Sequence, residues 1–89
     1  MEIKKYAVAG TMESSDVFVE IEPSGDGIII ELESVVEKQF GESIKKTVIE
    51  VLTQQGIKNA LVRVKDRGAL DCAIRARVET AILRGKEEN

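Results

Sequence analysis

The residues best suited to chemistry in this chain are residues 10–16, which read Gly-Thr-Met-Glu-Ser-Ser-Asp. Small polar residues of this kind favour exposed turns, where a side-chain hydroxyl stays accessible. The chain contains no histidine, and no neighbouring residue supplies a base that would activate Ser14 or Ser15 as a nucleophile. The two serines therefore indicate either a site that another protein modifies or an ordinary loop.

The other residues that might form a site do not combine into one. Glu20 with Glu22, and Glu31 with Glu33, lie two residues apart, so each pair would project from one face of a strand. No cluster of other metal ligands accompanies them, and we interpret both pairs as the solvated outer face of a sheet. Cys72 is the sole cysteine, which excludes an internal disulfide and a cysteine-based metal site. We expect Cys72 to be a small buried hydrophobe.

Two further motifs are interpreted as structural. Residues 24–27 are rich in glycine but lack a P-loop or dinucleotide-binding pattern, so we interpret them as a turn. Arg75, Arg77 and Arg84 would make the last helix partly basic, which we interpret as ordinary solvation of a helix surface and not as a docking patch. The sequence thus shows no catalytic constellation and no metal site.

Composition indicates one domain over residues 1–89. The chain is 43% hydrophobic, which is enough for one modest core. Its net charge is −3, with basic and acidic residues interspersed, so nothing favours a nucleic-acid partner. No apolar run approaches the roughly 20 residues that span a bilayer, and the N-terminus lacks the layout of a signal peptide. We therefore expect a cytoplasmic protein without a membrane partner.

Three strands are predicted in the first third of the chain. Residues 3–9 are compatible with a strand, residues 17–22 alternate between apolar and polar side chains, and a third strand begins at Ile28. Residues 23–27 contain a proline and two glycines, as tight reversals do. We therefore expect the second and third strands to pair as a hairpin.

A helical period begins near residue 40 and predicts a helix that stops at Gly56. The boundary before it stays open, because Ser34 and Glu37 have capping-box spacing whereas the strand alternation continues to Val36. The expected apolar stripe of this helix consists of Phe40, Ile44, Val48, Val51 and Leu52.

A fourth strand is expected over residues 57–65, followed by a turn at 66–68 and a second amphipathic helix up to about Leu83. Residues 85–89 form a charged tail. The order is three strands, helix, strand, helix, which predicts an α+β fold: a largely antiparallel sheet of about four strands, with both helices on its apolar face. The expected stripe of the second helix consists of Leu70, Ile74, Val78, Ala81 and Ile82.

Two segments resemble those of a known family. One is residues 10–16 with the valine-rich strand that follows and ends in Ile-Glu-Pro; the other is residues 66–81, Asp-Arg-Gly-Ala-Leu-Asp-Cys-Ala-Ile-Arg-Ala-Arg-Val-Glu-Thr-Ala. They closely resemble the acyl carrier protein of citrate lyase, its gamma subunit, and the similarity spans essentially the whole chain. The later segment is the more specific, since a short Ser-Ser-Asp occurs in many loops.

The resemblance implies a non-catalytic carrier. In that family the serine matching Ser14 is joined by a phosphodiester to phosphoribosyl-dephospho-CoA, whose thiol carries acetyl or citryl as a thioester. The alpha subunit exchanges acetyl for citrate, and the beta subunit cleaves the citryl thioester to oxaloacetate. The implied partners are these two subunits and the prosthetic-group transferase. The residues alone do not choose between Ser14 and Ser15; the resemblance chooses Ser14.

Two acidic residues flank the serines, and they would repel a free phosphate. We expect Glu13 and Asp16 to be recognised by basic residues or Mg²⁺ on the attaching transferase.

Two alternatives to the function that the resemblance implies remain. One is the acyl carrier subunit of malonate decarboxylase, which this chain resembles less well over residues 66–81. The other is a non-carrier interaction module, in which Phe18 and Ile29 form a docking patch.

Overall fold

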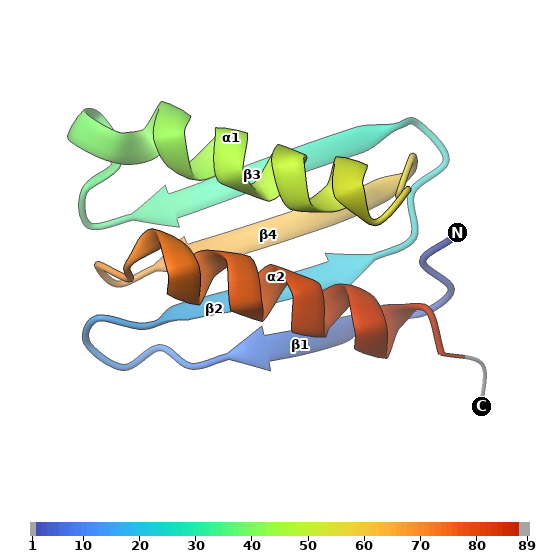
Figure 1. Cartoon of the computed structure of the whole chain (residues 1–89), viewed down its shortest axis with the longest axis horizontal. Helices are drawn as coiled ribbons and strands as arrows, with labels where there is room; N and C mark the ends of the chain where they lie inside the picture. Colours follow the sequence, from blue (N-terminus) through green and yellow to red (C-terminus); the bar gives the residue numbers. More distant parts are fainter. Residues whose placement is uncertain (1, 88–89) are drawn as a thin grey trace.

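The computed structural model describes residues 2–87, which form a four-stranded mixed sheet with two helices on one face (Figure 1). The predicted α+β class, the element order and the two-layer packing are confirmed. No helix in this part of the chain is long and apolar enough to cross a membrane. The elements are β1 (Ala7–Gly10), β2 (Val17–Glu22), β3 (Ile28–Ser34), α1 (Glu37–Gln54), β4 (Ala60–Asp66) and α2 (Asp71–Gly85).

The expected hairpin between β2 and β3 is wrong. The sheet order is β1-β2-β4-β3, so β4 lies between them, antiparallel to β2 and parallel to β3. β3, α1 and β4 therefore form a crossover unit, the connection that a parallel pair requires. A turn-rich segment reverses the chain without fixing which strand becomes the neighbour. β4 lies inside the sheet, where its inward side chains Ala60, Val62 and Val64 are fully buried, whereas the inward side chains of the edge strand β3 are only partly buried.

Both helices cover the apolar face of the sheet. α2 lies over β1 and β2, and α1 packs beside α2 and over β3 (Figure 1). Between these layers the side chains of Val17, Val19 and Ile21 have no exposed surface. Burial of this kind stabilises a fold by about 25 cal/mol per Å² of apolar area.

Three side chains that the sequence predicted to be buried are exposed. Phe40 is 52% exposed and Leu70 73%, and Cys72 is also exposed. Phe40 lies in the first turn of α1, and Leu70 is the N-cap of α2. Both helices begin beyond the ends of the strands (Figure 1). Helical periodicity assigns them to the apolar stripe but does not show that the sheet stops short of them. Cys72 lies two residues before the buried Ile74, which places it on another side of the helix.

Several boundaries differ from those expected. β1 and β4 begin later, because Ile3 and Ile57 bury their side chains in the core outside the strands. Gly85 is not part of a tail: it ends α2, is buried, and its carbonyl accepts hydrogen bonds from the N–H groups of Lys4 and Lys5. Residues 88–89 of the expected tail lie outside the described residues.

Ser34 settles the open boundary before α1. β3 ends at this residue, and Val36 is the N-cap of α1 without a side-chain hydrogen bond, so no capping box forms. Instead, the Ser34 hydroxyl accepts the Val36 N–H at 3.1 Å and donates to Oδ2 of the buried Asp66 at 2.8 Å. Ser34 therefore ties the β3–α1 junction to the end of β4.

The face of the sheet that no helix covers carries a ladder of charges. Arg63 on β4 donates to Glu22 on β2 at 2.7 Å and to Glu31 on β3 at 3.2 Å. Lys65 lies 3.7 Å from Glu20. Among residues 2–87 there is no group of acidic, histidine or cysteine side chains that could hold a metal ion. Glu20, Glu22 and Glu31 thus join neighbouring strands through ion pairs.

Candidate functional site

The serine loop, residues 11–16, joins β1 to β2 at the end of the molecule where both helices begin (Figure 1). The β3–α1 junction and the turn from β4 to α2 reach the same end. The loop is exposed around Ser14 and half-buried at Asp16.

Gly10 fixes the point where the loop leaves β1. Its φ is +91°, and a Cβ on this residue would lie 1.9 Å from the carbonyl oxygen of Val17. The same carbonyl accepts the N–H of Thr11 at 3.2 Å, which closes the base of the loop. Only glycine fits this close approach of two backbones.

The loop is also hydrogen-bonded to the turn that leads into α2. The Ser15 N–H donates to the carbonyl of Arg67 at 2.8 Å, and the Arg67 N–H donates to the carbonyl of Asp16 at 2.9 Å. These two bonds extend the β2–β4 pairing by one step beyond the strands. The serine loop and the β4–α2 turn therefore hold one another in place.

The backbone distinguishes the two serines. The Asp16 N–H donates to the carbonyl of Glu13 at 3.1 Å, which closes a β-turn with Ser14 second and Ser15 third. Ser15 has a φ of +64°, the one positive value at a non-glycine residue in the described chain, as the third position of a type II turn requires. Both hydroxyls are exposed without a partner among the described residues. Ser14 lies at the corner of the turn, whereas Ser15 is held by its N–H.

The Asp16 carboxylate organises the loop from inside. The Thr11 hydroxyl donates to Oδ2 at 2.6 Å, Arg77 donates to both oxygens at 3.0 and 3.2 Å, and the Val17 N–H donates to Oδ1 at 2.7 Å. These hydrogen bonds, that of Thr11 first and that of Arg77 second, lower the pKa of Asp16 from 3.8 to about 2. Asp16 is therefore ionised at neutral pH and is directed toward the protein.

The two acids predicted to be recognised by a partner thus differ. The Glu13 side chain is exposed and makes no hydrogen bond or ion pair with another described residue. Asp16 retains 18% of its side-chain surface and is occupied by donors of its own chain. The structure leaves Glu13 free to meet another molecule, and recognition of either acid by a partner stays a prediction.

Arg77 is the residue of the site that the sequence analysis missed. It lies on α2, 61 residues from Asp16, and its planar guanidinium donates hydrogen bonds to both oxygens of that carboxylate. The other two arginines also make contacts within the chain while staying at least partly exposed, since Arg75 bonds to Glu50 and Asp71, and Arg84 donates to a β1 carbonyl. The run over residues 66–81 contains Arg77, but no spacing along the chain indicates which loop its helix faces.

Known proteins share both the sequence and the fold. The family described as Malonate decarboxylase delta subunit (MdcD) matches residues 4–85. The citrate lyase acyl carrier protein of Halothermothrix orenii is 53% identical over 98% of this chain and 93% of its own length. That of Haemophilus influenzae (strain PittEE) is 56% identical over 99% and 92%.

A solved structure has the same fold at much lower identity. One chain of a Pseudomonas malonate decarboxylase hetero-tetramer in complex with malonate superposes with a TM-score of 0.80 at 22% identity, over 92% of this chain and 84% of that one. This likeness bears on the fold alone. The identities over nearly the whole length, together with the family match, show that the chain belongs to the citrate lyase acyl carrier protein family.

Proposed function

We propose that this protein, over residues 1–89, is the acyl carrier subunit of citrate lyase, and that it carries phosphoribosyl-dephospho-CoA on Ser14. The observation that supports Ser14 is its place at the corner of an exposed turn, with its hydroxyl free and its neighbours fixed. When attached, the group supplies a thiol that holds an acyl group as a thioester.

Attachment needs a general base. The serine hydroxyl must lose a proton as its oxygen bonds to a phosphorus atom of the donor and the bond between that phosphorus and the donor's leaving group breaks, and a general base works best with a pKa near the working pH. Asp16 has a pKa of about 2 and is occupied by Thr11 and Arg77, and the chain has no histidine. We infer that the transferase supplies the base and that it recognises the exposed Glu13.

The same geometry suits a carrier once the group is attached. An anchored arm raises the effective concentration of its acyl group at each enzyme that it reaches, provided that the anchor is accessible. Here the anchor lies at one end of the molecule on a loop fixed by Gly10, Arg67 and Arg77. The proposed partners are the alpha subunit, which exchanges acetyl for citrate, and the beta subunit, which cleaves citryl. The exposed, unpaired Cys72 suits the cytoplasm, which is reducing.

A malonate decarboxylase carrier is the second candidate. The description of the matching family favours it. The relatives that are 51–56% identical over nearly the full chain are named citrate lyase acyl carrier proteins, which supports the first candidate. Assembly of this chain with citrate lyase or with malonate decarboxylase subunits separates the two.

Reconstitution of citrate cleavage tests the proposal. Ser14→Ala should abolish cleavage by the assembled complex. Ser15→Gly is the matched control, because it removes the other hydroxyl and suits the positive φ of that position. We expect this control to retain cleavage. Full activity of the Ser14→Ala complex would refute the proposal.

A further inference from the structure

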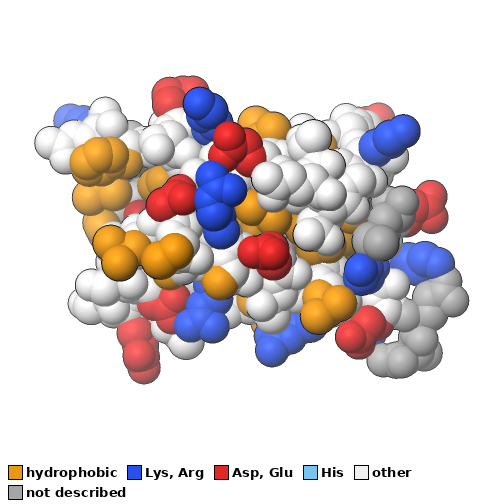
Figure 2. Space-filling model, in the orientation of Figure 1, with side chains coloured by type: hydrophobic (Ala, Val, Ile, Leu, Met, Phe, Trp, Pro, Cys, Tyr) orange, Lys and Arg blue, Asp and Glu red, His pale blue; other side chains and the backbone are white. Residues whose placement is uncertain are grey.

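Large hydrophobic side chains are exposed at the end of the molecule where both helices begin. Val35 is 64% exposed, Phe40 52% and Leu70 73%; we call these three residues the apolar end patch. Figure 2 shows hydrophobic side chains grouped at this end, over the starts of α1 and α2. Grouped exposure of apolar side chains marks binding surfaces, whereas single exposed ones are common everywhere.

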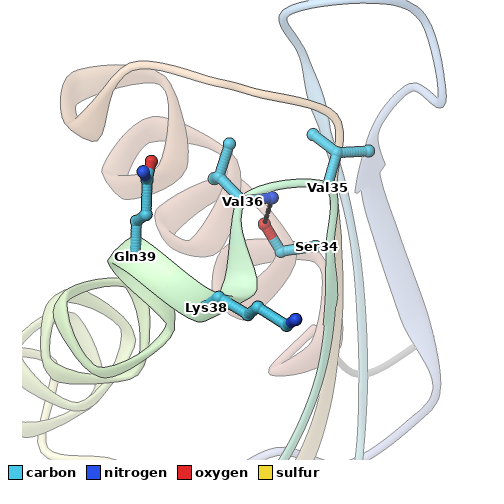
Figure 3. Close-up of a pocket in the computed structure, with 5 residues that line it drawn as sticks. All are labelled: Ser34, Val35, Val36, Lys38 and Gln39. Carbon is cyan, nitrogen blue, oxygen red and sulfur yellow. Dashed lines mark hydrogen bonds between the residues drawn. The ribbon is translucent and has the colours of Figure 1, made fainter.

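Two hollows lie beside these side chains. One, of about 300 Å³, lies between the first turns of α1 and α2 and is lined by Val36, Phe40 and Leu70 among others. The other, of about 740 Å³, lies at the β3–α1 junction, where Val36 and Gln39 project to one side of the helix start and Lys38 to the other (Figure 3). Because Val36 lines both, the hollows adjoin. Raised apolar side chains beside hollows suit the packed centre of a protein interface.

The apolar end patch is tied to the serine loop through the end of β4. The Val35 N–H donates to the carbonyl of Asp66 at 3.3 Å, and the next residue, Arg67, accepts the Ser15 N–H at 2.8 Å. Leu70 follows Arg67 by three residues, so their Cα atoms are at most about 11 Å apart. A standard interface of about 800 Å² per partner has a radius of about 16 Å. A protein that reaches Ser14 would therefore cover part of the patch.

One partner must reach Ser14 itself. The enzyme that attaches the prosthetic group forms its bond at the serine oxygen, whereas the lyase subunits act at the far end of the arm. We propose that the apolar end patch is the docking surface for this attaching enzyme, which places apolar side chains in the two hollows and a cation opposite Glu13. The inference rests on the proposed function, because it requires that Ser14 is modified.

The test measures transfer of the prosthetic group to the full chain by the purified transferase, followed by intact mass. The variant combines Phe40→Gln with Leu70→Gln. Glutamine is a good helix former at position 40, and Leu70 precedes the first helical residue of α2. The matched control combines Ile49→Gln with Leu83→Gln, whose side chains are 49% and 54% exposed on the same helices. We expect the patch variant to raise KM about tenfold with kcat unchanged, as loss of docking energy does, and the control to match the wild type.

The outcomes separate this inference from the proposed function. If the wild-type chain accepts no group from the transferase, both fail. If the wild type is modified and the KM of the patch variant is unchanged, or rises no more than that of the control, the proposed docking surface is wrong while the carrier function stands. If the patch variant accepts the group normally but no longer self-associates, the patch binds a second copy of the chain. If it accepts the group normally but loses citrate cleavage, the patch binds a lyase subunit. Either result would also overturn the inference. Circular dichroism and single variants check that the fold is kept.

Discussion

Replacing Gly10 with alanine tests how the serine loop is held to the sheet. The φ at this position is +91°, and a Cβ would lie 1.9 Å from the carbonyl oxygen of Val17. Gly68 provides a matched control, because its φ is also +91° while nothing lies within 4 Å of a Cβ there. The two substitutions share the cost of an unfavourable φ and differ in the steric clash.

The expected magnitude follows from these two terms. A residue with a side chain at positive φ costs about 1–2 kcal/mol, which both variants share. Overpacking adds about 1–3 kcal/mol, and the Val17 carbonyl cannot retreat without losing its hydrogen bond from Thr11 at 3.2 Å. We therefore expect Gly10→Ala to lower the free energy of unfolding by about 2 kcal/mol more than Gly68→Ala.

Urea and thermal unfolding, followed by circular dichroism, measure this difference. For a domain of this size, 2 kcal/mol corresponds to a Tm lower by roughly 8–16 °C. Equal losses in the two variants would refute the reasoning, because they would mean that φ alone matters and that the loop can move away from β2.

Three further predictions concern the network behind the loop. The pKa of Asp16 is lowered from 3.8 to about 2, so its contribution to stability is present above pH 3.8 and is lost as the pH falls toward 2. The urea midpoint of the Asp16→Asn variant should therefore depend less on pH across this window than that of the wild type. An equal pH dependence of the two midpoints would contradict this prediction. Arg77→Gln should slow transfer of the prosthetic group to Ser14 and Arg77→Lys should restore part of the rate, since lysine keeps the charge without the two-pronged contact; equal rates for both variants, measured by intact mass, would argue against positioning by Arg77. Thr47 is buried, and its hydroxyl donates to Asp71 at 2.6 Å. Thr47→Val should therefore lower the free energy of unfolding by about 1 kcal/mol in urea titrations. An unchanged free energy of unfolding would mean that this hydrogen bond between the helices does not stabilise the fold.

The order of elements follows from sequence periodicity, but the strand pairing does not. Alternation over residues 17–22 and the apolar helical stripes are local patterns, and they predict strands, helices and the face that each buries. Which strand lies beside β2 depends on competition between distant segments. β4 occupies the position beside β2, where Val62 and Val64 are fully buried. No local pattern in residues 23–34 indicates this pairing.

The site was predictable to a similar extent. Small polar residues and the missing base indicate an exposed loop suited to modification, and Ser14 and Ser15 are equivalent at that level. The difference between them arises from a turn whose third residue is held by Arg67. The contact of Arg77 with Asp16 spans 61 residues, so only the packing of α2 on the sheet reveals it.

Peptide-level mass spectrometry of the protein purified from citrate-fermenting cells tests the central proposal most directly. The proposal predicts a phosphoribosyl-dephospho-CoA adduct on the peptide that contains residues 11–16, with fragment ions that place it on Ser14. An unmodified peptide in the protein isolated from active citrate lyase, or an adduct placed on Ser15, would contradict it.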